Sequence, residues 1–451
     1  MQVHRLSLLL LLAFATPLAA QQDTTRIPTG VRLGMIYQTL KRPSLAVRAF
    51  TAADGVSAAE LVGDIVRRDL DYSDRFEMFE VPPQLADGPV DYATWNGLNV
   101  VYVLDGALEP LGEGDGYLLR LVLHDVVYGQ VKESQAFRIP PPTAPDHRMA
   151  VHAAADEVVR WVTGQPGMAA SRIVFVSQAA DGARDLMVVD SDGENLRRIA
   201  RVEGPLMSPA WSPDGRRVVY AVGRDDGSWD VIERDLETGA ETRVATRRGL
   251  NTTPVYSPDG TRIMLAAENG RDLDIFEIDL ATGRSRIVRG GPGADMSPTY
   301  SPDGRRIAFN SDRIGQPHIY VMSVEGGEAV LLSPYTYGEP GHYAAPDWSP
   351  ETSFVAFHGR SRGQHQIMVA DAARPGSTVQ QITQEGLNED PSWAPDGRHI
   401  VFVSVRPSGT GLYVIDAVSG RTRPLVLGGR LRTPDWSPTL ERASALTVRG
   451  E

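Results

Sequence analysis

The histidines are the first residues to examine for chemistry, because the chain has nine of them and no cysteine. His358 and His365 lie seven residues apart, on either side of an expected turn between two strands. Two imidazoles at this spacing could hold a metal ion, but such a site needs further ligands and the pair has no nearby carboxylate partner in the sequence. We therefore expect turn or face residues here and no metal site.

The sequence also predicts no catalytic residues. We expect no nucleophile elbow of the Gly-x-Ser-x-Gly type, no glycine-rich phosphate loop and no metalloprotease helix motif. A peptidase attached to a β-propeller carries its own α/β-hydrolase domain, and the region ahead of the repeats described below is too short for one. The chain is therefore expected to be no enzyme and to need no cofactor. Two alternatives stay open: a propeller hydrolase or lyase that acts on peptides or sugars in the channel, and a secreted propeller that binds a small ligand or glycan.

Composition and charge narrow the class of partner. The 451 residues are 42% hydrophobic and 23% charged, which is ordinary for globular domains. The formal net charge of -12 disfavours nucleic acid and phospholipid surfaces, because binding to these relies on Lys and Arg that neutralise phosphate. The lack of cysteine excludes disulfides, thiolate metal sites and a lipid-modified cysteine. A soluble monomer that binds a basic or neutral protein is predicted.

A secretory signal peptide is predicted over residues 1–20. Arg5 gives a basic start, an apolar run extends from Leu8 to Phe14, and small residues lead to Ala20, where we place the cleavage. The run is too short to cross a bilayer as a helix, which takes about 20 apolar residues. The mature chain is therefore expected to be secreted.

An internal repeat dominates the second half of the chain. Six segments share a Pro-x-aromatic-(Ser/Ala)-Pro unit, which four of them extend with Asp-Gly. The aromatic residues are Trp211, Tyr256, Tyr300, Trp348, Trp393 and Trp436, spaced 43 to 48 residues apart. This period is that of a four-stranded propeller blade. We expect the aromatics to pack between blades, and the aspartates at 214, 259, 303 and 396 to fix their turns and not to bind calcium.

The ends of the repeat array predict how the ring closes. A partial blade with strands at 172–177 and 185–190 precedes the first aromatic unit and lacks an innermost strand of its own, while no room for three further strands follows the last unit. The two fragments together make one blade, which removes the exposed edges. The fold predicted for residues 171–451 is therefore an all-β six-bladed β-propeller.

A compact α/β domain is predicted ahead of the propeller, over residues 42–165. Strands are expected at 45–50, 75–80, 99–105, 117–125 and 130–137. Ser57 and Glu60 form a capping box that opens a helix, Asp91 is expected to cap a short helix through Trp95, and 147–163 has the spacing of an amphipathic helix. Residues 21–41 form an arm that belongs to neither domain, and we expect it to pair with a sheet edge of this chain or of a partner.

Partner contacts are expected where each blade leads into the innermost strand of the next, because these connections rim the mouth of the propeller. The residues there mix apolar, amide and charged side chains, as a protein-docking rim does. The insertion at 334–343 adds three tyrosines, Tyr335, Tyr337 and Tyr343, which favour a contact role. The predicted mouth residues are Met207, Leu250, Asn251, Thr252, Thr253, Asp295, Met296, His342, Tyr343, Asn388, Glu389 and Arg432.

These features together resemble the TolB family, the periplasmic β-propellers of the Tol-Pal envelope system of Gram-negative bacteria. The resemblance covers the secretion signal, the arm, the α/β domain and the propeller. The stretches that carry it beyond a generic propeller are Asp190–Asn195, Met207–Gly215, Gln364–Ile367 and Pro434–Pro438.

The resemblance implies two partners and a place in the cell. A peptidoglycan-associated lipoprotein like Pal is expected at the propeller mouth, and a trans-envelope protein like TolA is expected on the arm. Both belong to a periplasmic system that supports outer-membrane integrity and constriction. The arm residues assigned to the TolA-like partner are Val31, Arg32, Leu33, Met35 and Ile36.

Overall fold

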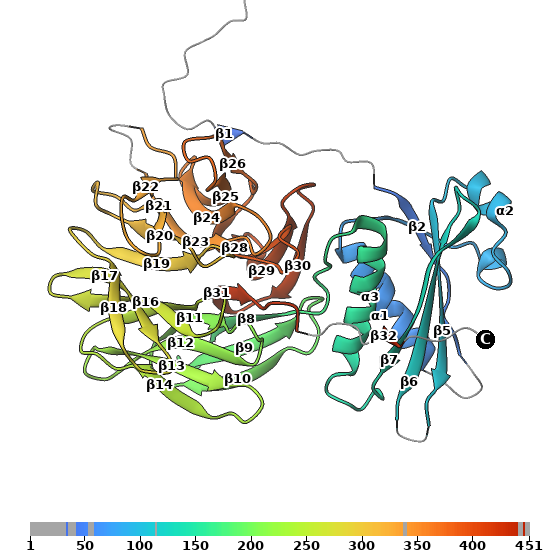
Figure 1. The fold of residues 1–451 in the computed structure, drawn as a ribbon, viewed down its shortest axis with the longest axis horizontal. Helices are drawn as coiled ribbons and strands as arrows, with labels where there is room; N and C mark the ends of the chain where they lie inside the picture. The colour runs from blue at the N-terminus through green and yellow to red at the C-terminus, as the bar shows by residue number, and fades with distance from the viewer. Residues whose placement is uncertain are drawn as a thin grey trace, which may run out of the picture. The chain divides into compact units, whose positions relative to one another are not determined.

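The computed structural model describes residues 33–34, 42–52, 58–112, 115–336, 341–440 and 445–446. Its described part contains a mixed sheet with helices, followed by six antiparallel blades (Figure 1). The predicted fold class is therefore confirmed. The signal peptide at 1–20 and most of the arm lie outside the described residues. None of the described helices is both long and apolar enough to cross a membrane.

The first domain is a mixed sheet with helices on both faces. Helices α1 (Ala58–Tyr72) and α3 (His147–Thr163) pack on each other and on one face, where they bury Leu45, Leu104 and Phe137. Helix α2 (Tyr92–Gly97) covers the other face through Trp95. A single turn of 3-10 helix covers Pro83–Leu85. The sheet order is β32-β7-β6-β5-β2-β4, with β3 also on β5; these strands are β2 (Ser44–Val47), β3 (Thr51–Ala52), β4 (Glu77–Phe79), β5 (Tyr102–Pro110), β6 (Tyr117–Asp125), β7 (Gln130–Ile139) and β32 (Ala445–Leu446).

Most expected elements of this domain are present, with shifted ends. Helix α3 begins and ends where predicted, and the Asp91 side chain caps α2 by accepting a hydrogen bond from the Ala93 backbone N–H at 3.2 Å. The strand expected at 45–50 ends at Val47 and resumes as β3. Ser57 of the expected capping box lies outside the described residues.

The propeller contains six blades of four strands each. Blade one is β11 (Leu206–Trp211), β12 (Arg217–Gly223), β13 (Trp229–Asp235) and β14 (Glu241–Ala245). Blade two is β15 (Asn251–Tyr256), β16 (Arg262–Asn269), β17 (Asp272–Asp279) and β18 (Ser285–Arg289). Blade three is β19 (Asp295–Tyr300), β20 (Arg306–Ser311), β21 (His318–Ser323) and β22 (Val330–Leu331). Blade four is β23 (Tyr343–Trp348), β24 (Phe354–Ser361), β25 (Gln364–Asp371) and β26 (Val379–Gln381). Blade five is β27 (Leu387–Trp393), β28 (His399–Arg406), β29 (Gly409–Asp416) and β30 (Thr422–Leu427).

The sixth blade joins the two ends of the repeat array, as predicted. Strand β31 (Arg430–Trp436) pairs antiparallel with β8 (Arg172–Gln178), which continues into β9 (Arg184–Asp190) and β10 (Arg197–Val202). The Trp436 indole N–H donates to Ser171 Oγ at 2.7 Å across this closure. Each innermost strand contacts the next, and β31 contacts β11, so the ring is closed.

The repeat side chains have the structural roles predicted for them. Trp211 packs with Val174 of blade six and Val218 of its own blade, and is therefore held between blades. In blade two Ser257 Oγ donates to Asp259 Oδ1 at 2.6 Å, and the Thr261 N–H donates to the same oxygen at 3.0 Å. The Asp259 carboxylate thus accepts hydrogen bonds from donors of its own turn.

Two short strands extend the sheets at the chain ends. Strand β1 (Leu33–Gly34) pairs parallel with β26, so the arm adds to a sheet edge of its own chain, one of the two alternatives expected. Strand β32 pairs antiparallel with β7. The sequence predicts a propeller that extends to residue 451, but β32 pairs with β7, so the chain returns to the α/β sheet after the last blade.

Candidate functional site

The mouth of the propeller is shaped by one backbone feature that recurs in every blade. In each innermost strand the residue before the repeat proline has a positive φ, between 44° and 53°. The antiparallel register shifts by a bulge at the same place. A positive φ costs energy for a residue with a side chain, so the surrounding ring must hold it. The six residues are Ser208, Thr253, Ser297, Ala345, Asp390 and Thr433.

Side chains of the preceding blade accept the backbone N–H of the repeat aromatic at four of the six blade junctions. Without these acceptors the N–H groups would be buried and unpaired. The four bonds run from Trp211 N–H to Asp435 Oδ2 at 2.7 Å, from Trp348 N–H to Thr299 Oγ1 at 3.2 Å, from Trp393 N–H to Asp347 Oδ2 at 2.7 Å, and from Trp436 N–H to Ser392 Oγ at 3.0 Å.

The central channel beneath the mouth is narrow. One triplet from each blade lines a cavity of about 120 Å³, including Pro209, Pro254 and Pro298. Pockets that hold small ligands usually measure about 300–1,000 Å³. The channel is therefore too small for a peptide or an oligosaccharide, which argues against the alternative of an enzyme that acts inside it.

The predicted mouth residues divide into two groups by burial. The buried group is Asn251, Thr252, Asp295, Tyr343 and Asn388. The accessible group is Met207, Leu250, Thr253, Met296, His342, Glu389 and Arg432, which are half-buried or exposed. Their role in binding a partner stays a prediction, and only the second group offers side chains to one.

The buried mouth residues hold the loops together. Asn251 Nδ2 donates to the carbonyls of Trp229 and Arg247, both at 2.7 Å. Asp295 accepts from Arg313 at 2.9 Å and lies 3.3 Å from Arg289. Thr252 is packed against Met207 and donates to its Sδ at 3.3 Å. Amide and carboxylate groups at a predicted mouth can therefore also serve as internal hydrogen-bonding groups.

The tyrosine insertion is less exposed than expected. Tyr335 is exposed and its ring lies 5.6 Å from His318, but Tyr343 is buried against His318 and Phe357. Tyr337 lies outside the described residues.

Three histidines form a cluster beside the mouth, which we call the histidine corner: His342, His358 and His365, with Glu389. The His365 ring centroid lies 5.0 Å from both other rings, and His342 and His358 are 6.4 Å apart. His365 Nδ1 lies 2.6 Å from Glu389 Oε1. Glu389 comes from β27 of the next blade, so this carboxylate is not apparent from the sequence around His358 and His365.

Contrary to the prediction that the chain lacks this motif, residues 359–363 of blade four match the Gly-x-Ser-x-Gly spacing. A nucleophile elbow needs a sharp turn from a strand into a helix. Here Ser361 ends β24 and the turn leads into β25, and Ser361 Oγ donates to Gln381 Oε1 at 2.8 Å. The motif is therefore a hairpin turn, and it supplies no catalytic serine.

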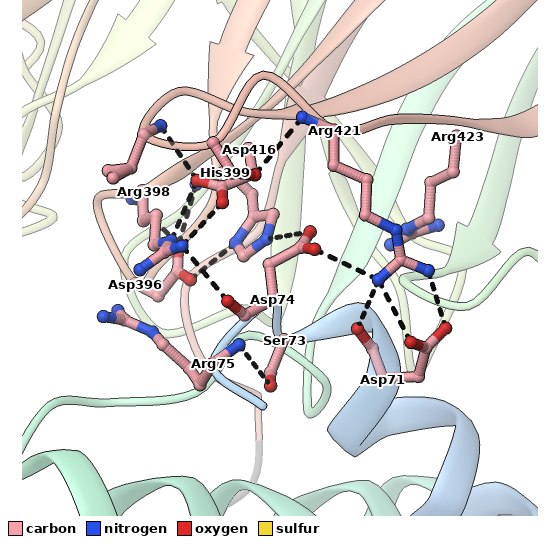
Figure 2. Close-up of polar contacts among 12 residues, drawn as sticks. Asp71, Ser73, Asp74, Arg75, Asp396, Arg398, His399, Asp416, Arg421 and Arg423 are labelled. Atoms are coloured by element: carbon pink, nitrogen blue, oxygen red, sulfur yellow. Dashed lines mark hydrogen bonds and ion pairs between the residues drawn. The ribbon is translucent and has the colours of Figure 1, made fainter. Parts of the chain in front are cut away.

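A second polar cluster joins the α/β domain to blade five (Figure 2). His399 donates from Nδ1 to Asp396 Oδ2 at 2.7 Å and from Nε2 to Asp74 Oδ2 at 3.3 Å. Burial lowers the pKa of His399, but the Asp396 carboxylate and the hydrogen bonds to Asp396 and Asp74 raise it more, to about 9. Burial raises the pKa of Asp396, but His399 lowers it more, to about 2. His399 is therefore a buried imidazolium between two carboxylates.

Arginines complete this domain junction. Arg421 of the turn between β29 and β30 donates to Asp71 Oδ2 at 2.7 Å and to Asp74 Oδ1 at 3.1 Å. Arg398 donates to the Asp74 carbonyl at 3.2 Å, and Arg423 stacks over the Tyr72 ring at 4.0 Å. Sequence reasoning missed this junction, although His399 marks it: Arg217, Arg262 and Arg306 occupy the same repeat position in other blades.

Asp192 anchors a third cluster at the junction, where it meets α1 and α3. Arg148 and Arg68 both pair with the Asp192 carboxylate, while His152 Nδ1 lies 2.7 Å from Asp69 Oδ2. Among the described residues, Asp69, His152 and Asp192 are the group of ligand-type residues whose atoms converge within 4.8 Å. Because the two arginines already neutralise Asp192, this is an ion-pair network and carries no metal proposal.

Comparisons with known proteins agree with this architecture. A model described as the TolB amino-terminal domain matches residues 35–131, and one described as the TolB beta propeller domain matches 159–440. The Tol-Pal system protein TolB of Methylococcus capsulatus is 34% identical over 184 residues, which cover 39% of this chain and 42% of that protein. Its counterpart from Thioalkalivibrio sulfidiphilus is 34% identical over 218 residues, covering 47% and 48%. The matched region thus spans less than half the length of these curated relatives.

A solved structure is similar over a longer span. The crystal structure of TolB from Acinetobacter baumannii superposes with a TM-score of 0.76 at 25% identity, and covers 90% of this chain and 100% of that one. The propeller model alone matches more than half of the residues here. This chain therefore belongs to the TolB family.

Proposed function

We propose that this protein is a non-enzymatic periplasmic adaptor of the Tol-Pal system. It binds a Pal-like peptidoglycan-associated lipoprotein at the propeller mouth and a TolA-like envelope protein through the arm at 21–41, and it supports outer-membrane integrity and constriction during cell division. The observation that carries the proposal is the joint match of the α/β domain and the propeller to one family, behind a predicted secretion signal. Both partners are thus expected outside the cytoplasm.

The accessible mouth residues suit a protein partner. Met207, Leu250 and Met296 are half-buried apolar side chains, whereas Glu389 and exposed Arg432 supply charge. Protein interfaces combine an apolar centre with a polar rim in this way. Because the channel below holds only about 120 Å³, the surface and not the interior of the ring is the place to dock.

The arm suits strand addition. Leu33 and Gly34 already pair through their backbone with Val379 and Gln380 at the outer edge of blade four. A segment that adds to one sheet edge has the geometry to add to another, in a partner. Val31, Arg32, Met35 and Ile36 lie outside the described residues, so their role stays a proposal.

Changing three accessible apolar residues is expected to weaken docking at the mouth. The variant combines Met207→Ala, Leu250→Ala and Met296→Ala, and we expect at least a roughly tenfold rise in Kd for the periplasmic domain of the same organism's Pal-like lipoprotein, because central apolar contacts dominate interface energy. Binding is measured by calorimetry with residues 21–451. The matched control combines Ile287→Ala, Val330→Ala and Leu427→Ala, which are exposed apolar residues on outer strands, and should bind like the wild type. Equal weakening of both triple variants, or no binding by the wild type, would contradict the proposal.

Deleting the arm is expected to affect binding of only one of the two partners. A chain that begins at residue 42 is expected to keep its affinity for the Pal-like domain and to lose binding to the periplasmic part of the TolA-like protein. Pull-down and calorimetry with each partner measure the two interactions independently. Retention of TolA-like binding after the deletion would move that site elsewhere on the protein.

A further inference from the structure

The histidine corner lies within the proposed docking surface. His342 immediately precedes β23, His358 lies on β24 and His365 on β25, and Glu389 reaches them from β27. His358 is buried, while His342 and His365 are half-buried. Packing between blades does not require three neighbouring imidazoles, because blades one and two contain no histidine. Two of the three rings in the corner are only half-buried.

Both acidic and basic side chains face the histidine corner. Glu389 is the acceptor for both His365 at 2.6 Å and Arg432 at 2.9 Å. The Asp390 side chain bonds outside the corner, because its Oδ2 accepts the Thr433 N–H at 3.2 Å. Its backbone N–H donates to His358 Nδ1 at 3.2 Å. Arg360 adds another exposed cation beside His342.

One ring nitrogen in the corner has no partner. His342 Nδ1 is buried and makes no hydrogen bond to another described residue, and its ring lies against His365 with the charge of Arg360 nearby. Burial, followed by the charge of His365, lowers the pKa of His342 in the free protein. The same two causes lower the pKa of His358 to about 3. Glu389 is already taken by His365 and Arg432, so in the free corner no carboxylate among the described residues is hydrogen-bonded to the His342 ring.

We propose that the histidine corner receives a carboxylate of the protein that docks at the mouth, and that His342 takes up a proton as that carboxylate arrives. This inference rests on the proposed function and names the chemistry of its partner. Arg432 and Arg360 attract the acidic group, and the partner carboxylate supplies the negative charge that His342 lacks. Because the whole protein carries a net charge of -12, it repels an extended acidic surface. The arginines of the corner therefore favour a single acidic side chain over such a surface.

The sign of the pH dependence follows from linkage. A carboxylate beside His342 favours its charged form, so the pKa of the imidazole rises on docking. A group whose pKa rises on binding takes up a proton, and binding tightens as pH falls through the range between the free and bound values. The affinity is therefore expected to increase on acidification until the partner carboxylate itself is protonated.

Calorimetry over pH tests the inference with the wild-type protein. Residues 21–451 are titrated with the Pal-like periplasmic domain at about pH 6 and about pH 8, in two buffers of different ionisation enthalpy, which counts the protons taken up. We expect binding to be about tenfold tighter at the lower pH, which corresponds to about half a proton taken up on average over this range. In the variant His342→Gln both the pH dependence and the proton uptake should disappear, while His124→Gln, in the α/β domain, should behave like the wild type.

The outcomes separate the two proposals. Equal affinity at both pH values without proton uptake, or tighter binding at the higher pH, would overturn the carboxylate assignment and leave the adaptor function standing. No binding at either pH would overturn the adaptor function and the inference with it. The wild-type proton count does not depend on a variant, so the test holds even if His342→Gln fails to fold.

Discussion

Replacing His399 with alanine is expected to lower the free energy of unfolding by about 3–5 kcal/mol and to loosen the α/β domain from the propeller. The change removes the cation from a buried set in which Asp396 and Asp74 both accept from it. Breaking a buried ion pair on one side leaves an uncompensated charge, which costs about 3–5 kcal/mol. The lost stability is expected to weaken the domain junction, because Asp74 belongs to the α/β domain and Asp396 to blade five.

The matched control is the same repeat position in blade two. Arg262 pairs with Asp259 at 3.2 Å and is one third exposed, so Arg262→Ala is expected to cost about 1 kcal/mol or less. Urea unfolding followed by tryptophan fluorescence compares the variants, and limited proteolysis reports whether the linker at 164–170 becomes accessible. Similar losses for both variants would show that the junction contributes no more than an ordinary blade position.

A double-mutant cycle assigns the effect to the contact between domains. Combining His399→Ala with Asp74→Asn should cost clearly less than the sum of the single losses, because both variants remove the same interaction. Purely additive losses would mean that His399 serves only its own blade through Asp396.

The stability difference between the wild type and His399→Ala should depend on pH with a defined sign. The pKa of His399 is about 9 in the folded protein and 6.5 for the free side chain. The contribution is therefore complete below about pH 6.5 and is lost as pH rises through about 9. Asp396 has a pKa of about 2 against 3.8, so its share is complete above about pH 4 and is lost as pH falls through 2. The difference should be largest between about pH 4 and 6.5.

The propeller could be predicted from the sequence because its signals are local. Each Pro-x-aromatic-(Ser/Ala)-Pro unit specifies a strand and a turn by short-range chemistry, and six copies spaced 43 to 48 residues apart leave little choice of fold. The closure by β31 could be predicted as well, since a partial blade at each end can be completed only by the other. The strands of the α/β domain were found for the same reason, with errors of a few residues at their ends.

The domain junction and the histidine corner depend on contacts that spacing does not encode. Asp74 and His399 are 325 residues apart, and Glu389 comes from a different blade than His358 and His365. The mouth residues Asn251 and Asp295 could not be recognised as buried from spacing alone, because their partners Trp229 and Arg313 lie about 20 residues away on other strands or turns. Deviations within the repeat, such as His399 in place of arginine, were the sequence signal that could have located the junction.

Asparagine in place of Asp347 is expected to stabilise the propeller above neutral pH. Asp347 is half-buried at the channel and accepts the Trp393 N–H at 2.7 Å. Burial raises its pKa to about 6, although hydrogen bonds from Trp393, Ser392, Thr299 and Trp348 oppose the rise. An asparagine carbonyl can accept the same hydrogen bond without ever carrying the charge.

The sign again follows from the direction of the shift. Because the folded-state pKa of about 6 lies above the usual 3.8, the wild type is favoured when Asp347 is protonated and loses stability as pH rises from about 4 past 6. A difference of about two pKa units corresponds to about 3 kcal/mol at most. Asp347→Asn should therefore match the wild type near pH 4 and exceed it by about 1–3 kcal/mol near pH 8, as measured by urea unfolding at both pH values.

Alanine at the same position separates the charge from the hydrogen bond. Asp347→Ala leaves the Trp393 N–H without an acceptor, and a buried unpaired N–H costs about 1–3 kcal/mol. This variant should be less stable than Asp347→Asn at every pH. Equal stability of the two variants would mean that the N–H finds another acceptor, and a wild type that is steady between pH 4 and 8 would mean that Asp347 keeps an ordinary pKa. Under either result the blade-to-blade hydrogen bonds that shape the mouth would depend on the serine and threonine positions, not on the carboxyl groups of Asp347 and Asp435.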